Sequence, residues 1–298
     1  MLTIRMESAS IGDADVHAVE SFVADWLTEA GVPGAAVAVV EDDDVAYAEG
    51  FGARDLETEA PATPDTLFGV ASCTKPFTAI AVMQLVERGD LALDDRVADS
   101  LPHVEDAPGD PITVAELLSH TSGLPSDDQA GALFGPALGL DVDPVPLTTD
   151  ADLRRHVQGS LDRRVTDRET FFYYNTGYAL LALLVEEHAG QPFGKYVEEH
   201  VLEPAGMPRA TFDAGAFEAV DDRMTPYLDA GDGLEPTSFP FRRHTRDAGG
   251  LLASVRDLAN AIRLFLGDGV VDGERVLDPE SVAAMTTPAA EFGTYLDG

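Results

Sequence analysis

The sequence contains very little lysine, asparagine or cysteine. Lysine and asparagine occur twice each in 298 residues, and the one cysteine, Cys73, excludes an intrachain disulfide. No apolar run is long enough to cross a membrane, and residues 1–26 lack the apolar stretch of a signal peptide. From these absences we expect a soluble, cytoplasmic protein.

Basic residues are also scarce. Lysine and arginine total 19 against 54 aspartate and glutamate residues, which gives a net charge of −35. This charge repels nucleic acid and anionic membranes, so we expect neither as a partner. Apolar residues make up 45% of the chain and recur periodically, which excludes a disordered acidic protein. Because salt screens charge repulsion, we expect a halophilic protein from a high-salt cytoplasm; the alternative is an acidic mesophilic protein.

Several common kinds of site are missing from the sequence. It has no Gly-x-Ser-x-Gly nucleophile elbow, no His-Glu-x-x-His pair and no EF-hand loop. The glycine-rich patterns that bind dinucleotides and phosphates are also absent. We therefore expect no metal ion and no cofactor.

Ser72 and Lys75 form a Ser-x-x-Lys pattern at the predicted start of a helix that ends near Gly89. Residues three apart share a helix face, so the lysine amine can reach the serine hydroxyl. To act as a base at pH 7, Lys75 must lower its usual pKa of about 10.4 by roughly 3 units, which burial and the helix dipole both favour. A helix cap followed by a solvated lysine fits the same pattern. Cys73 points about 100° away from Ser72 on a helix, so we expect it to pack rather than react.

Tyr173 and Asn175 form a second pattern, Tyr-x-Asn, which uses one of the two asparagines. A tyrosine beside a lysine can pass a proton to a leaving group, and an amide can hydrogen-bond a substrate. A buried aromatic cluster with Asn175 as a helix N-cap is the alternative, and the two interpretations are compatible. The two patterns arise together by chance with a probability well under about 1%, which favours catalysis.

Periodicity predicts the order of elements. A hairpin with strands over 35–40 and 45–51 follows an amphipathic helix over 15–30. The middle of the chain is predicted to be mostly helical, and no strand pattern follows Met285. The helix that starts at the Ser-x-x-Lys pattern has Pro76 in its first turn and is predicted to run to about Arg88. The other predicted helices cover 114–119, 150–158, 176–188, 193–201, 255–266 and 279–285, with a Pro- and Gly-rich connector over 130–146.

A series of segments in one order is similar to a known family, over about Val32 to Pro288. The segments are Phe68–Thr78, Leu85–Val97, Leu117–Pro125 with its Ser-His-Thr-Ser-Gly-Leu-Pro, Phe172–Tyr178, Glu203–Met207, Ala248–Ser254 and Asp257–Ala259. The chain resembles the serine beta-lactamase-related family, which includes class C beta-lactamases, D-alanyl-D-alanine carboxypeptidases and esterases.

The resemblance implies an α+β fold of the beta-lactamase/transpeptidase type, with an antiparallel sheet flanked by helices and an inserted all-helical region. Residues 1–88 and 246–298 would form the sheet region, and 89–245 the helical region. The function implied is that of a serine hydrolase that cleaves a small amide or ester through an acyl-enzyme, without a cofactor. Ser72 would be the nucleophile, with its own N–H as half of the oxyanion hole; Lys75 and Tyr173 would share proton transfer, and Asn175 would bind the substrate.

One expected motif is missing. The family carries Lys-Thr-Gly or His-x-Gly on a C-terminal strand, and here only 188–190 fits, at the end of a predicted helix. We therefore expect a chain truncated at its C-terminus, with an incomplete sheet whose unpaired edge can self-associate. The alternative function is a non-catalytic binder resembling a penicillin-binding protein, or an inactive fragment.

Overall fold

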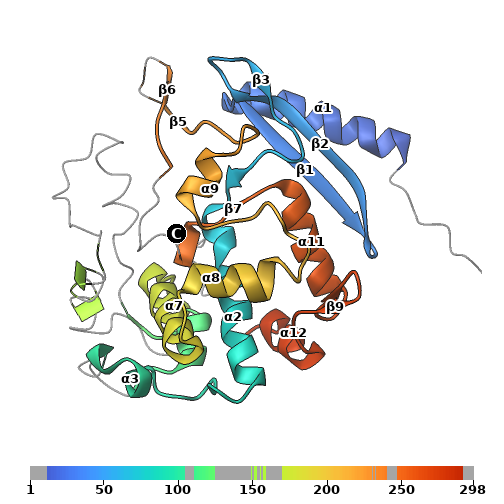
Figure 1. The fold of residues 1–298 in the computed structure, drawn as a ribbon. Helices are drawn as coiled ribbons and strands as arrows, with labels where there is room; N and C mark the ends of the chain where they lie inside the picture. The colour runs from blue at the N-terminus through green and yellow to red at the C-terminus, as the bar shows by residue number, and fades with distance from the viewer. Residues whose placement is uncertain are drawn as a thin grey trace, which may run out of the picture.

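The protein is seen in a computed structural model as a mixed α+β fold (Figure 1). The described part of the chain starts with a helix and a hairpin and continues through a group of helices, and a helix in its last third packs against the hairpin. The structure describes residues 12–104, 111–124, 149, 151–152, 155, 157–158, 170–229, 231, 233–239 and 247–290.

The hairpin predicted near the N-terminus is confirmed. Strands β1 (Gly34–Glu41) and β2 (Asp44–Asp55) pair antiparallel, and the short strand β3 (Ala60–Pro61) lies on the other side of β2. Gly52 has a left-handed backbone (φ 66°), and a Cβ at this position would lie 2.2 Å from the carbonyl oxygen of Pro33. Only glycine fits this close approach of the two strands.

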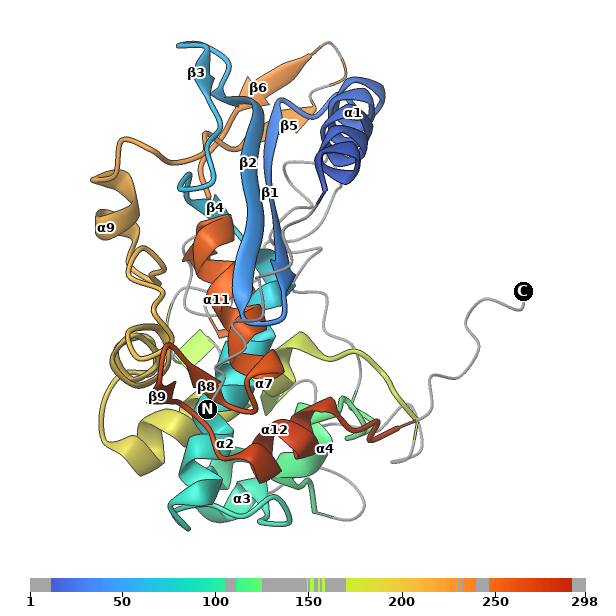
Figure 2. The ribbon, with the colours of Figure 1, turned by 90° about the vertical axis from the view of Figure 1, so that its right-hand side faces the viewer.

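Helices cover both faces of this hairpin. The helices α1 (Asp13–Ala30) and α11 (Val255–Leu266) lie on opposite sides of the two strands (Figure 2). Arg263 of α11 donates hydrogen bonds to the carbonyl oxygen of Asp43 in the hairpin turn and to the carboxylate of Asp272, each at 2.6 Å. The predicted antiparallel sheet flanked by helices is therefore confirmed.

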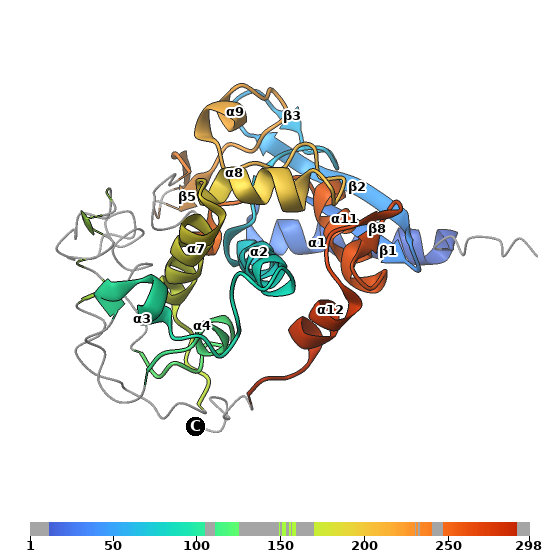
Figure 3. The same cartoon turned by 60° about the horizontal axis from the view of Figure 1, so that its bottom comes forward.

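The central helix of the molecule is α2 (Lys75–Glu87). Its apolar side chains are buried on several sides, which is typical of a helix enclosed by others. Figure 3 shows α7 (Asn175–Ala189), α8 (Phe193–Val197) and α12 (Pro279–Thr286) around it, and each of the three contacts α2. One hydrophobic core joins α2 to these neighbours, so the helix that carries Lys75 is held from several directions.

Local signals set the ends of the longer helices. The N-terminus of α11 has a capping box in which Ser254 accepts from the Asp257 N–H and the Asp257 carboxylate accepts from the Ser254 N–H. Helix α7 ends at Gly190, whose backbone is left-handed (φ 67°). The predictions for α7, α11 and α12 are confirmed to within about two residues.

Other predictions differ from the structure. The helix predicted over 193–201 is divided into α8 and a π-helical turn, η3 (Glu198–Leu202). The connector over 130–146 and most of the helix over 150–158 lie outside the described residues, as do residues 291–298. The division into regions 1–88 with 246–298 and 89–245 stays a prediction, as does the C-terminal truncation.

The remaining elements are short. They are β4 (Phe68–Gly69), η1 (Ala71–Thr74), α3 (Val97–Ser100), η2 (Pro102–Val104), α4 (Val114–Leu118), α9 (Ala214–Glu218), β5 (Tyr227–Asp229), β6 (Leu234–Pro236), β7 (Leu252–Ala253), β8 (Val270–Val271) and β9 (Glu274–Arg275).

Among the described residues, no strand pairs with the outer edge of β1. No helix in the same part of the chain is both long and apolar enough to cross a membrane.

Candidate active site

Ser72 is exposed and lies in the 3₁₀ turn η1, one turn before α2, rather than within the helix. Ala71 before it has a left-handed backbone (φ 47°), which is costly for a residue with a Cβ and persists only where the surroundings impose it. The buried Thr74 supplies part of that support: its hydroxyl donates to the Ala71 carbonyl (2.7 Å) and accepts from the Leu251 N–H (3.0 Å). The turn therefore presents the serine hydroxyl on a fixed backbone.

Lys75 is the first residue of α2 and is only 6% exposed. Its Nζ lies 3.2 Å from Ser72 Oγ, 2.9 Å from Asn175 Oδ1 and 2.9 Å from the carbonyl oxygen of Ala248. The amide oxygen and the carbonyl oxygen can only accept hydrogen bonds, whereas the serine hydroxyl can also donate. In its neutral form the amine would donate to those two oxygens and direct its lone pair at the Ser72 hydroxyl.

Tyr173 approaches the same oxygen from the segment before α7. Its hydroxyl donates to Ser72 Oγ at 2.8 Å, and its side chain is partly exposed. Lys75 Nζ lies 4.7 Å from the centre of the Tyr173 ring, which is within cation–π range. Ser72 Oγ thus has an amine and a phenol as direct neighbours, and both can carry its proton.

Asn175 is the first residue of α7, and its Oδ1 accepts from Lys75 Nζ. The N-cap of α7 is Tyr174, which makes no side-chain capping bond, so the predicted N-cap role of Asn175 is wrong. The structure brings all four predicted site residues together: Ser72, Lys75, Tyr173 and Asn175.

Two further predictions concern Cys73 and residues 188–190. Cys73 is exposed, so its prediction as a packing residue is wrong; the 3₁₀ turn orients it differently from the α-helix that the sequence predicted. His188 lies in the last turn of α7 beside the cap Gly190, and its Nε2 pairs with Ser100 Oγ at 2.8 Å. Residues 188–190 are therefore a helix end, as the sequence indicated, and not the missing third motif.

Sequence reasoning missed His120 and Tyr178. The His120 ring lies 4.5 Å from the Tyr173 ring and 5.1 Å from the Tyr178 ring. The Tyr178 hydroxyl donates to the Leu118 carbonyl at 2.9 Å, and burial raises the pKa of this phenol. His120 belongs to the Ser-His-Thr-Ser-Gly segment, but no spacing rule connects that segment to residue 173.

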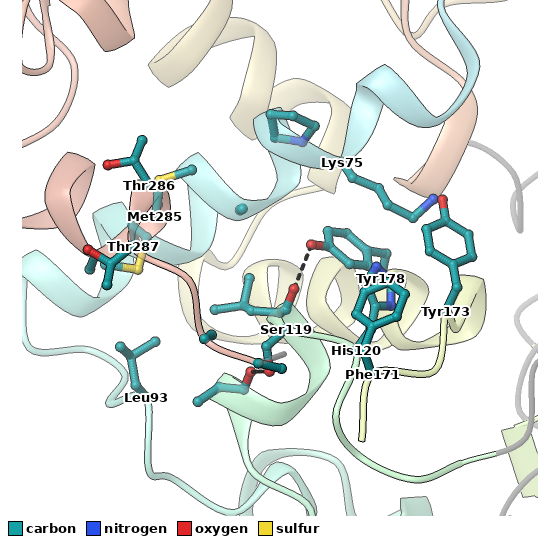
Figure 4. Close-up of a pocket in the computed structure, with 18 of the residues that line it drawn as sticks. Lys75, Leu93, Ser119, His120, Phe171, Tyr173, Tyr178, Met285, Thr286 and Thr287 are labelled. Carbon is teal, nitrogen blue, oxygen red and sulfur yellow. Dashed lines mark hydrogen bonds between the residues drawn. The ribbon is translucent and has the colours of Figure 1, made fainter. Parts of the chain in front are cut away.

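A cavity of about 840 Å³ opens beside the site (Figure 4). Lys75 and Tyr173 converge at one end, while Met285, Thr286 and Thr287 lie at the other. Helix α2 contributes the apolar residues Pro76, Ala79 and Met83 to the cavity wall. The volume is within the range of small-molecule sites. Across the described part of the chain, no group of three His, Cys, Asp or Glu side chains could hold a metal ion.

The chain is similar to known proteins over most of its length. The family model described as Beta-lactamase matches residues 18–297. Penicillin-binding protein 4 of Amycolatopsis lactamdurans is 32% identical, over 88% of this chain and 67% of that protein. Protein flp of Staphylococcus aureus (strain MW2) is 28% identical over 69% of this chain, which spans only 40% of the length of that protein.

Solved structures show the same relationship. The octameric penicillin-binding protein homologue from Pyrococcus abyssi superposes with a TM-score of 0.87 at 35% identity, over 95% of this chain and 63% of that chain. The penicillin-binding protein from Bacillus halodurans has a TM-score of 0.72 at 26% identity, over 90% of this chain and 78% of that chain. The family match and these superpositions show that the chain belongs to the beta-lactamase family and has its beta-lactamase/transpeptidase-like fold.

Proposed function

We propose that this chain is a serine hydrolase that transfers an acyl group from a small amide or ester to Ser72 and then to water. One observation carries the proposal: Ser72 Oγ lies 2.8 Å from the Tyr173 hydroxyl and 3.2 Å from Lys75 Nζ, on a strained and exposed turn. A nucleophile beside a base that a third group orients is the arrangement that covalent catalysis requires. Asn175 is that third group, because its amide oxygen holds the amine.

The first half of the reaction acylates Ser72. Lys75 Nζ takes the hydroxyl proton as Oγ forms a bond to the substrate carbonyl carbon. The Ser72 N–H stabilises the resulting oxyanion. The carbon–nitrogen or carbon–oxygen bond then breaks, and the Tyr173 hydroxyl gives its proton to the leaving group. Lys75 returns the serine proton to Tyr173, which restores both side chains.

The second half releases the acyl group. Water attacks the ester on Ser72, and its proton passes to the Tyr173 and Lys75 pair. The bond from Oγ to the acyl carbon breaks, and Ser72 regains a proton from the same pair. We assign the NH₂ end of Asn175 to the substrate carbonyl, because its oxygen already accepts from Lys75. An acyl group or leaving group with apolar surface fits the cavity beside Lys75 and Tyr173.

A covalent adduct tests this function. We expect a labelled fluorophosphonate to add one phosphonyl group to the folded chain, as intact mass and peptide mapping would show at Ser72. The adduct should disappear in Ser72→Ala and persist in Cys73→Ser. The cysteine variant is a matched control because Cys73 is the adjacent, exposed nucleophilic side chain.

The outcomes separate the two candidate functions. If labelled penicillin and the fluorophosphonate both leave the folded wild-type chain unmodified in high salt, the chain is a non-catalytic binder or an inactive fragment. If the adduct maps to Cys73, the assignment of Ser72 is wrong. Circular dichroism on the same samples shows whether each chain is folded.

We also propose that the chain works in a high-salt cytoplasm, on the strength of its net charge of −35. In 0.1 M KCl the screening length is about 10 Å, so surface carboxylates repel one another, whereas above 1 M it falls to about 3 Å or less. The midpoint of thermal unfolding should therefore rise from 0.1 M to 3 M KCl. Equal midpoints in the two solutions would contradict this adaptation.

Self-association is a further part of the proposal. Within the part of the chain that the structure describes, the outer edge of β1 carries no paired strand. Unpaired edges favour association between chains. The Pyrococcus homologue, described as octameric, supports the same expectation.

A further inference from the structure

His120 follows α4 and is 7% exposed, with a left-handed backbone (φ 59°). Histidine is several-fold enriched among the few residues other than glycine that adopt this conformation, but the conformation is still uncommon. It persists where surrounding contacts determine it, and such residues gather at functional sites. Several of the contacts that hold His120 involve the segment that carries Tyr173.

The backbone on both sides of Tyr173 is bonded to His120. The Phe172 N–H donates to the His120 carbonyl oxygen at 2.8 Å, and the Tyr174 N–H donates to His120 Nδ1 at 3.1 Å. Because Nδ1 accepts a hydrogen bond, it carries no proton, and the proton of the neutral ring is on Nε2. One histidine thus fixes the peptide groups before and after the tyrosine.

The His120 ring also supports the Tyr173 ring. The centres of the two rings lie 4.5 Å apart, with an angle of 31° between their planes. The Tyr178 ring also contacts the His120 ring, at 5.1 Å and 34°. Lys75 Nζ is 4.7 Å from the centre of the Tyr173 ring and 5.4 Å from that of Tyr178. Figure 4 shows these side chains grouped at one end of the cavity.

We propose that His120 is a positioning residue for acylation, an inference that rests on the proposed function. Its unprotonated Nδ1 and its ring hold Tyr173 so that the phenol hydroxyl contacts Ser72 Oγ. His120 does not touch the reacting atoms. It acts by fixing the orientation of the Tyr173 side chain. A misplacement of about 1 Å in a reacting group can lower the rate about a hundredfold.

The charge state of His120 suits this role. The groups that face it are Lys75 from α2, Tyr178 from α7, and Tyr173 with Phe171 from the segment before α7. Burial, and then the charge of Lys75, lower the pKa of His120 to about 4. A proton on Nδ1 would face the Tyr174 N–H as donor against donor, so the contact depends on the neutral ring.

Two substitutions separate the acceptor from the ring. His120→Asn places an amide oxygen near the position of Nδ1 and tolerates the left-handed backbone. His120→Phe keeps a ring but leaves the Tyr174 N–H without its acceptor. We expect the rate constant for fluorophosphonate acylation of Ser72 to fall at least about tenfold in His120→Phe and to stay within about threefold of wild type in His120→Asn. Wild-type rates in both variants would overturn the role of His120.

A second measurement does not depend on activity or on variant folding. Imidazole ¹⁵N spectra of the wild-type chain should show, for one histidine, an unprotonated Nδ1 and a protonated Nε2 from pH 8 down to about 5. Titration of His120 near 6.5 would overturn the proposal. If the wild-type chain is not acylated at all, the proposed function fails, and the spectra still decide the state of His120; if it is acylated normally in His120→Phe, only the positioning role fails.

Discussion

Substitution of Lys75 by methionine is expected to lower the rate constant for acylation of Ser72 by about a thousandfold, within the range of general-base catalysis. Methionine fills a similar volume but has no basic lone pair. It also removes the donor that Asn175 Oδ1 and the Ala248 carbonyl now share. The measurement is the time course of fluorophosphonate labelling, with circular dichroism to show that the variant is folded.

The controls use the chemistry of the two lysines in the chain. Lys75→Arg keeps positive charge and donors but cannot accept a proton, so it should be as inactive as the methionine variant. Lys195→Met should label at the wild-type rate, because Lys195 is 60% exposed and forms an ion pair with Glu199 at the start of η3. Rapid labelling of Lys75→Met would remove the amine from the mechanism and leave Tyr173 as the base.

The stability of the fold should fall between pH 6.5 and pH 4 because of His120. In the folded chain its pKa is about 4, whereas the unfolded chain has the ordinary value near 6.5. Between these values the unfolded state binds a proton that the folded state does not, so acidification favours unfolding. The resulting loss of folding free energy is absent above pH 6.5 and reaches about 3 kcal/mol near pH 4.

Urea unfolding at several pH values measures this effect, with His120→Asn as the matched control. The many carboxylates titrate in both chains, so the difference between wild type and variant isolates the histidine. The stability advantage of the wild-type chain should shrink by about 3 kcal/mol from pH 7 to pH 4. A constant difference over this range would show that His120 is accessible to protons in the folded state.

Local signals made much of this structure predictable. The start of α11 depends on the capping box of Ser254 and Asp257, and the end of α7 depends on the left-handed Gly190. Both signals involve residues that are close in the sequence, so these two helix ends can be predicted from it. The pairs Ser72 with Lys75 and Tyr173 with Asn175 are local as well. Their meeting was inferred from a resemblance to a family, because no physical rule relates residues a hundred positions apart.

What the sequence did not reveal depends on distant contacts. The side-chain Nδ1 of His120 accepts from the Tyr174 N–H across 54 positions, and this contact leaves no trace in residue periodicity. Strands β4 and β7 pair over two residues each, too few for an alternating pattern. The exposure of Cys73 depends on whether its turn is 3₁₀ or α, and propensity does not decide between these geometries over four residues.

The turn that carries Ser72 is held by residues that are translated long after it. Val70 and Thr74 bond to Leu251, Thr78 bonds to the Asp247 carbonyl, and Lys75 bonds to Ala248. At roughly 5–20 residues per second, a ribosome needs on the order of 10–35 s to add that stretch. Under the proposed function, Ser72 would therefore become a nucleophile only after residues 247–251 have been synthesised and have left the exit tunnel.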